Sequence, residues 1–248
     1  MKHLLLTTIA AVVLVGCGEA QLPETENISI HDSGLDRNIE SVKLNDRVLR
    51  WAQQILLGPE FGGEGEVCSL WVESPSISVF GGSTKEYKVV METVLQLNEI
   101  LTNTKLKQLR MVTRNNTGAD IRVYFIPLNE FFDAATKHGF TYVKGNLGYF
   151  WTFWNAQHEI NRAYVLLASD KLRGEELQHF ALEEITQALG LSNDSPIFHD
   201  SIFHSGNGNT LELSELDRKL VKFFYNYVKP GTNKKELEAA LIKYWSNP

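Results

Sequence analysis

The sequence predicts an α+β fold: a twisted mixed sheet of about five strands, a helix behind it and further helices toward the carboxyl end. Three observations predict it. Apolar residues follow helical spacing over 87–101, apolar and polar residues alternate over 119–126, and an almost unbroken apolar run fills 162–168. The unbroken run is typical of a strand that is buried on both faces, as in a parallel part of a sheet.

The other elements follow from the same periodicities and from Gly and Pro residues that end helices and strands. Helices are expected over 45–57, 129–137, 174–189, from 214 onward and over 233–245, and strands over 70–80, 109–113 and 147–154. Ser214-x-x-Asp217 has the spacing of a capping box, with aspartate in place of glutamate. The aromatic strand over 147–154 is expected at a sheet edge, either as core packing or as a platform for a partner.

The first 16 residues predict a bacterial lipoprotein signal peptide. Lys2 precedes an apolar run over 4–15 that is too short to span a bilayer as a stop-transfer helix. The small residues before Cys17 resemble a lipobox, which implies cleavage before Cys17 and a lipid, including palmitate, at that cysteine. Because no aspartate follows Cys17, the outer membrane facing the periplasm is the expected location. The alternative is an ordinary secretory signal with an incidental cysteine.

The composition of the remaining residues indicates the domain organisation and limits the possible partners. Residues 17–42 are polar and predict a flexible tether, and residues 43–248 suit a single domain. A hydrophobic fraction of 43% with five tryptophans allows a sizeable core. A net charge of -6 without a basic stripe argues against a nucleic-acid partner. If Cys17 carries lipid, Cys68 has no partner within the chain, and we expect it to be a small buried side chain.

One short stretch of the helix expected over 174–189 and the residues after it carry the chemistry. Their spacing resembles the H-E-x-x-H-x-x-G-x-x-H motif of metzincin-type zinc proteases. Glu184 stands where the general base would be, and Gly190 stands where the chain would turn. The three ligand positions hold Glu183, Gln187 and Asn193 instead of histidines. The order of the predicted elements is also that of the amino-terminal half of zincins.

Glu184 falls on an otherwise apolar face of the predicted helix. A carboxylate there must find hydrogen-bond partners or take up a proton, because an unpaired buried charge is costly. Glu184 is therefore either a general base in a cleft, with Glu183 and Gln187 beside it, or a structural carboxylate satisfied by nearby donors.

Metal binding is a separate question. Glu183, Gln187 and either Asn193 or Asp194 would offer only oxygen ligands, which suit calcium or magnesium better than zinc. Zinc and calcium both stay open, and no cofactor is assigned. A second set of nearby side chains would form a different site or simply face solvent: His179, His199 and His204. The last methionine, Met111, precedes the motif, so the methionine turn of metzincins is absent from its usual place.

With its flanks, the motif resembles the signature of the domain of unknown function 2927 family. The matching residues are Glu183-Glu184-x-x-Gln187-x-Leu189-Gly190-Leu191-x-Asn193-Asp194, Ser201-Ile202-Phe203, Leu213-Ser214-x-x-Asp217, Phe223-Phe224-Tyr225 and Pro230-Gly231, with Trp71, residues 77–81 and 119–123 upstream. The resemblance implies a divergent zincin fold on a secreted or lipid-anchored protein and assigns no substrate. Many relatives carry a second cysteine just before the glutamates, where this chain has residues 179–182 without one.

Two functions remain in view. One is a cell-envelope lipoprotein that binds a peptide or an envelope protein without catalysis, as a pseudo-enzyme or binding module that holds a peptide strand against the edge strand. The other is a divergent hydrolase or metallohydrolase, acting on peptide or cell-wall substrates with Glu184 as general base. A structural lipoprotein without a small ligand is a third alternative.

Overall fold

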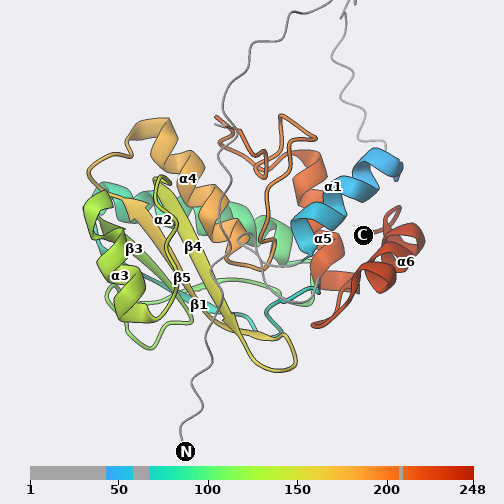
Figure 1. Ribbon diagram of the computed structural model, residues 1–248, viewed down its shortest axis with the longest axis horizontal. Helices are drawn as coiled ribbons and strands as arrows, with labels where there is room; N and C mark the ends of the chain where they lie inside the picture. Colours follow the sequence, from blue (N-terminus) through green and yellow to red (C-terminus); the bar gives the residue numbers. More distant parts are fainter. Residues whose placement is uncertain (1–42, 58–66, 207–208) are drawn as a thin grey trace, which may run out of the picture. The chain divides into compact units, whose positions relative to one another are not determined.

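A five-stranded mixed sheet forms the centre of the described structure (Figure 1). The computed structural model describes residues 43–57, 67–206 and 209–248. The strands are β1 (Ser76–Gly81), β2 (Arg110–Met111), β3 (Ile121–Ile126), β4 (Gly148–Trp154) and β5 (Ile160–Ala168). Their spatial order is β2-β1-β3-β5-β4, with β4 antiparallel to β5 and the other pairs parallel. The predictions for residues 1–42, lipid on Cys17 included, lie outside the described residues.

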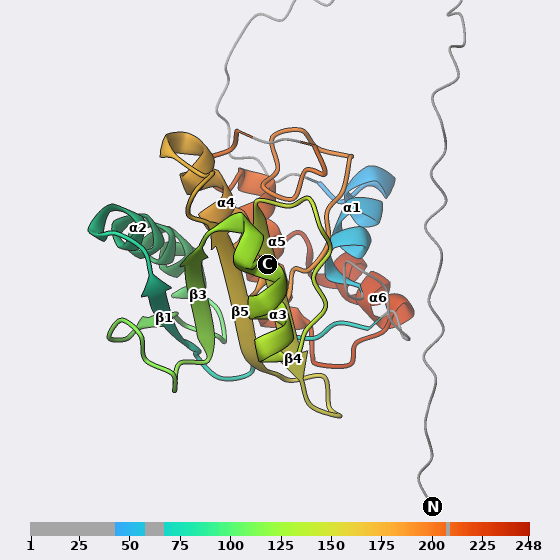
Figure 2. The same cartoon turned by 60° about the vertical axis from the view of Figure 1, so that its left-hand side comes forward.

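Helices cover both faces of this sheet. The helices of the described structure are α1 (Asp46–Leu56), α2 (Thr84–Leu101), α3 (Phe131–His138), α4 (Gly174–Gln187), α5 (Glu215–Tyr227) and α6 (Lys234–Tyr244), with a 3-10 turn η1 (Leu128–Glu130) before α3. Helix α6 packs against α1 and α5. Helices α2 and α4 pack against each other on one face, and α3 crosses the other face (Figure 2). The α+β class and the expected order of the elements are thus confirmed. Within the described part of the chain, no helix is both long and apolar enough to span a membrane.

The two strand patterns behave as their sequences predict. Along β3, the side chains of Ile121, Val123 and Phe125 are buried and the alternate ones are half-buried. Along β5, the run over 163–168 is buried throughout, because this strand lies between β3 and β4 and under helices. The aromatic strand β4 is an edge strand, as expected.

Several boundaries differ from the sequence-based expectation, and three of them concern the segments around the site. The strand expected from residue 70 begins only at Ser76, directly after Pro75, and Leu70 makes an isolated bridge instead. Helix α2 begins at Thr84 because Ser83 and Glu86 form a capping box there. Helix α4 ends at Gln187, two residues earlier than expected.

The aromatic side chains of β4 serve mainly as packing. Tyr149 and Phe150 are buried, and the ring of Phe140 stacks on Tyr149 and on Trp151. Trp154, at the end of the strand, is 41% exposed. The platform interpretation therefore applies to this last residue more than to the cluster as a whole.

Cys68 is fully buried, as expected for a small apolar side chain. Burial raises the pKa of its thiol to about 12. A thiol with so high a pKa stays protonated at neutral pH, so it is a poor nucleophile.

Candidate functional site

Helix α4 is fixed in place by its apolar side and by bonds at its carboxyl end. The indole nitrogen of Trp71 donates to the carbonyl of Ala188 at 3.0 Å, and the hydroxyl of Tyr225 donates to that of Leu189 at 2.6 Å. Both carbonyls belong to the end of a helix, where no intrahelical partner is left. These buried bonds tie the end of α4 to two distant segments and so set the direction of its polar side.

Gly190 turns the chain after α4, as its place in the motif predicts. Its φ is +102°, a conformation that side chains with a Cβ rarely adopt. A Cβ at this position would also run into the carbonyl oxygen of Ser69 and lie 3.2 Å from Ile160. Gly190 therefore allows both the turn and the close approach of the chain around Ser69.

A cleft of about 660 Å³ opens beside the polar side of α4. The first residues of β4 form one wall, α4 forms another, and the loop after α4 closes it. Its lining includes Gly145, Gly148, Tyr149, Glu175, Glu176, His179, Phe180, Glu183, Glu184, Gln187, Asp194, His204 and Asn209. Five carboxylates and two imidazoles in this set make the cleft acidic.

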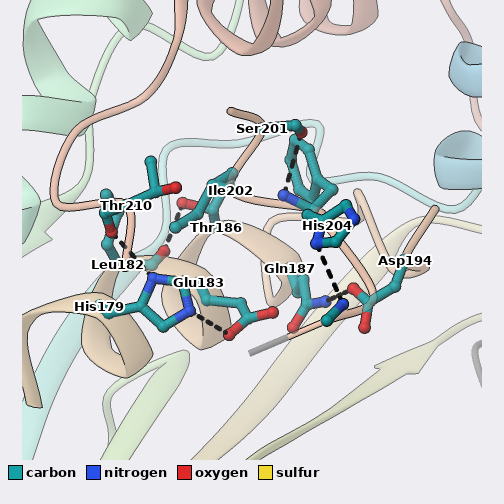
Figure 3. A network of polar contacts seen from close by, with 12 residues as sticks. His179, Leu182, Glu183, Thr186, Gln187, Asp194, Ser201, Ile202, His204 and Thr210 are labelled. Atoms are coloured by element: carbon teal, nitrogen blue, oxygen red, sulfur yellow. Dashed lines mark hydrogen bonds and ion pairs between the residues drawn. The ribbon is translucent and has the colours of Figure 1, made fainter. Parts of the chain in front are cut away.

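His179 and Glu183 form one polar pair of the wall, one helical turn apart (Figure 3). The Nε2 of His179 lies 3.3 Å from Oε2 of Glu183, and its Nδ1 lies 2.8 Å from the carbonyl oxygen of Thr210. Burial alone would lower the pKa of His179, but the bonds to Glu183 and Thr210 and the negative charges of Glu183 and Asp194 outweigh it. The net effect is a raised pKa, which favours an imidazolium facing the carboxylate.

Gln187 and Asp194 form the second polar pair. The Nε2 of Gln187 donates to Oδ1 of Asp194 at 2.7 Å, which joins the end of α4 to the following loop (Figure 3). Burial and the negative charge of Glu183 raise the pKa of Asp194 to about 7, against the opposing effects of Gln187 and His179. A carboxyl group that titrates near neutrality in a cleft is typical of functional sites, although structural networks produce the same shift.

Glu184 lies against the edge strand β4. Only 6% of it is exposed, which confirms that it belongs to the buried side of α4. A Cβ at Gly148 would lie 2.9 Å from the Glu184 carboxyl carbon and 2.7 Å from the Phe180 ring. The absence of a side chain at Gly148 is therefore what lets this carboxylate approach the strand backbone.

The structure brings Glu183, Glu184 and Gln187 to one wall, as the motif predicts, but it does not bring Asn193 there. The amide of Asn193 instead donates to the carbonyl of Leu57 at 3.0 Å, after α1. The turn at Gly190 redirects the chain, and Asp194 takes the place beside Gln187 that spacing assigned to Asn193.

The predicted oxygen ligands therefore do not fit a metal as a set. Gln187 is joined to Asp194 through its amide nitrogen, Glu183 faces His179, and Asn193 points away. Across residues 43–57, 67–206 and 209–248, no group of three or more His, Cys, Asp or Glu side chains is arranged to hold a metal ion.

The three histidines separate into two places. His179 is part of α4, whereas His199 and His204 lie in the loop, with ring centroids 4.4 Å apart. His204 lines the cleft and its Nδ1 accepts from the amide of Gly206 at 3.2 Å. Helical spacing places His179 one turn before Glu183, but its second partner, the carbonyl of Thr210, lies 31 positions later and carried no sequence signal.

The loop that closes the cleft is anchored by Asp217. This aspartate is fully buried and accepts from the hydroxyls of Ser201 and Ser214 and from the amides of Ile202 and Ser214, at 2.6 to 3.0 Å. The predicted capping box of α5 is confirmed, and its aspartate also holds the loop that carries His204. Burial raises the pKa of Asp217 against these four bonds.

Solved structures and a protein family are similar to this chain. A crystal structure of myroilysin is 11% identical and aligns with 76% of this chain and 99% of its own, with a TM-score of 0.41. A second myroilysin structure is 13% identical over 63% of this chain and 82% of its own, with a TM-score of 0.39. A comparison with curated proteins found no match.

The family comparison agrees with the resemblance carried by the motif and its flanks. The model described as protein of unknown function (DUF2927) matches residues 48–243, which include every wall of the cleft, and the chain belongs to this family.

Proposed function

We propose that this protein is a non-catalytic binding module that holds an extended, positively charged peptide segment in the cleft beside β4. The observation that carries the proposal is the position of the cleft at the start of an edge strand. Gly148 and Tyr149 line the cleft, and β4 pairs only with β5 among the described strands. The outer side of an edge strand can serve as a template for an added peptide strand.

The charge of the cleft supports a cationic ligand. Its carboxylates outnumber its imidazoles, and the pKa of Asp194 is raised first by burial and then by repulsion from the negative charge of Glu183. A lysine or arginine side chain or a free amino group entering the cleft would relieve this repulsion. A cation also explains why the wall is polar on a helix whose opposite side is packed into the core.

The internal pairing of the wall favours binding over catalysis. His179 is held by Glu183 and Thr210, and Gln187 is held by Asp194, so these side chains form fixed surfaces. Such groups bind a ligand well because little ordering remains to be done on association.

The test is a binding measurement on the domain of residues 43–248. Synthetic hexapeptides with a central lysine should bind at least about tenfold more tightly than the same peptides with norleucine, which lacks only the ammonium group. Glu183→Gln should remove this preference, and Glu92→Gln on the exposed side of α2 is the matched control. Methylation of alternate peptide nitrogens should also weaken binding, because it blocks pairing with β4. Equal binding of lysine and norleucine peptides would contradict the proposal.

A second candidate is a divergent hydrolase with Glu184 as general base. One observation favours it: a carboxyl group with a pKa of about 7, Asp194, shares the cleft with Glu184. Two carboxyl groups held in different environments are a common arrangement for acid and base roles. Cleavage of a fluorogenic peptide mixture that is lost in Glu184→Gln, together with stoichiometric metal in the purified domain, would replace the binding-module proposal with this one.

We propose further that Cys17 carries lipid and places the domain at the outer membrane, facing the periplasm. The support is the lipobox-like sequence before Cys17 and the apolar run that precedes it. Palmitate labelling of the full-length chain should give a labelled, membrane-bound protein, and Cys17→Ser should lose both label and membrane binding. Labelling that persists in Cys17→Ser would contradict the proposal.

A further inference from the structure

A second cavity, of about 590 Å³, continues from the cleft across Gly145. Gly145 lines both cavities, so the two cavities adjoin at this loop. The second cavity is formed mainly by Leu128, Phe132, Tyr142, Lys144, Asp170 and Lys171. It lies between the start of α3, the loop before β4 and the segment after β5.

The apolar part of this cavity is exposed. Phe132 is 66% exposed, among the most exposed of the large apolar side chains in the described residues. Tyr142 is held in place by edge-on packing against Phe131, with ring centroids 5.6 Å apart. A ligand group between Phe132 and Tyr142 would remove apolar surface from water without moving the buried core.

The charged side chains of this cavity are not all paired with one another. Asp170 accepts from the amide of Leu128 at 2.8 Å and faces the ammonium of Lys171 at 3.4 Å, so its charge is already matched locally. No salt bridge of the described residues involves Lys144, which leaves one positive charge at the rim. The cavity is therefore suited to an apolar group next to an anion, the opposite of the acidic cleft.

We infer that this cavity holds the carboxyl-terminal residue of the bound peptide, its apolar side chain between Phe132 and Tyr142 and its carboxylate at Lys144. The inference rests on the proposed peptide-binding role of the cleft. The chain order supports it, because the cavity residues 142–145, the cleft residues 145–149 and the rest of β4 follow one another. A peptide ending in the cavity runs antiparallel to β4, the pairing that is slightly more stable per residue.

The test uses fluorescein-labelled hexapeptides in which one lysine stands two to five positions before a final phenylalanine. Each is made with a free carboxylate and with a carboxamide, and binding to the full-length protein is followed by polarisation. We expect the best free-acid peptide to bind about fivefold more tightly than its amide, as for a partly exposed ion pair. Replacing the final phenylalanine by glycine should cost about tenfold.

Two variants assign these preferences to the cavity. Lys144→Gln should remove the preference for the free acid over the amide and keep the preference for phenylalanine over glycine. Phe132→Ser should remove the preference for phenylalanine and keep the preference for the free acid. The controls are Lys137→Gln, an exposed lysine on α3 outside the cavity, and Leu95→Ser on α2, which is 61% exposed. Both controls should keep both preferences.

The outcomes separate the two proposals. Lysine-dependent binding that ignores the carboxyl terminus and the last side chain would overturn the inference and leave the proposed function standing. If both preferences persist in Lys144→Gln and Phe132→Ser, the last residue of the peptide binds outside this cavity, and the inference is also overturned. Lack of binding by every peptide would overturn both.

Discussion

Helices α4 and α5 both carry buried acidic side chains, but the surroundings of these side chains differ. On α5, Asp217 is surrounded by donors and accepts four hydrogen bonds from Ser201, Ile202 and Ser214. On α4, Glu183 and Glu184 face a cleft that holds further carboxylates. One of these is Asp194 of the following loop, whose pKa is raised to about 7. Asp217 therefore serves the fold alone, whereas the carboxylates of the cleft, of which Glu183 is paired with His179, also present negative charge to a ligand.

The largest effect is expected on the α5 side of this comparison. Asp217→Ala leaves the buried Ser201 hydroxyl and the Ile202 amide without their acceptor, so we expect a loss of about 3 kcal/mol in the free energy of unfolding. Urea unfolding measures it, with Asp200→Ala, an exposed aspartate of the same loop, as a control expected within about 0.5 kcal/mol of the parent. A loss below about 1 kcal/mol would show that the loop is anchored by other contacts.

The next effect concerns the approach of Glu184 to β4. Gly148→Ala places a methyl group against the Glu184 carboxyl and the Phe180 ring, and we expect about 2 kcal/mol of destabilisation from this overpacking. In a Glu184→Ala background the same substitution should cost clearly less, because one of the two obstructing groups is gone. Equal costs in both backgrounds would mean that Glu184 does not press on the strand.

The pH dependence of stability distinguishes Asp194 from an ordinary surface carboxylate. Its pKa is about 7 in the folded chain against 3.8 as its reference, so the folded state binds the proton more tightly and stability falls as pH rises between these values. Asp194→Asn keeps an acceptor for Gln187 and removes this penalty. We expect a gain of about 1 kcal/mol at pH 8, after allowance for solvent screening, and almost none near pH 4.

The smallest effect is expected at His179. Its raised pKa means that the folded state holds the proton more tightly, so this stabilisation is complete below pH 6.5 and is lost as pH rises through the folded pKa. His179→Gln should therefore cost about 0.5 kcal/mol more at pH 6 than at pH 9. A cost that does not change with pH would mean that His179 is neutral in the folded protein and acts by packing alone.

Much of the fold could be predicted because it depends on local pattern. The alternation along β3, the apolar run of β5 and the capping box at Ser214 each specify an element within a few residues. The sequence also placed Glu183, Glu184 and Gln187 together, since residues three and four apart share a side of a helix.

The rest of the site depends on the path of the chain after the helix, which spacing does not determine. After the turn at Gly190, Asp194 and not Asn193 lies beside Gln187, and the second partner of His179 is the distant carbonyl of Thr210. The role of Gly148 could not be predicted from the sequence either, because it depends on which strand α4 packs against. Helical periodicity predicts neighbours within one element, whereas contacts across a loop require the tertiary structure.

The most direct test of the central claim is nuclear magnetic resonance of the isotope-labelled domain of residues 43–248, titrated with the best lysine peptide. If a cation enters the cleft beside the edge strand, the largest shifts should occur at backbone amides of β4 and of residues 183–187, and Glu183→Gln should reduce them together. Shifts confined to other parts of the domain, with those two segments unchanged, would contradict a peptide-binding cleft.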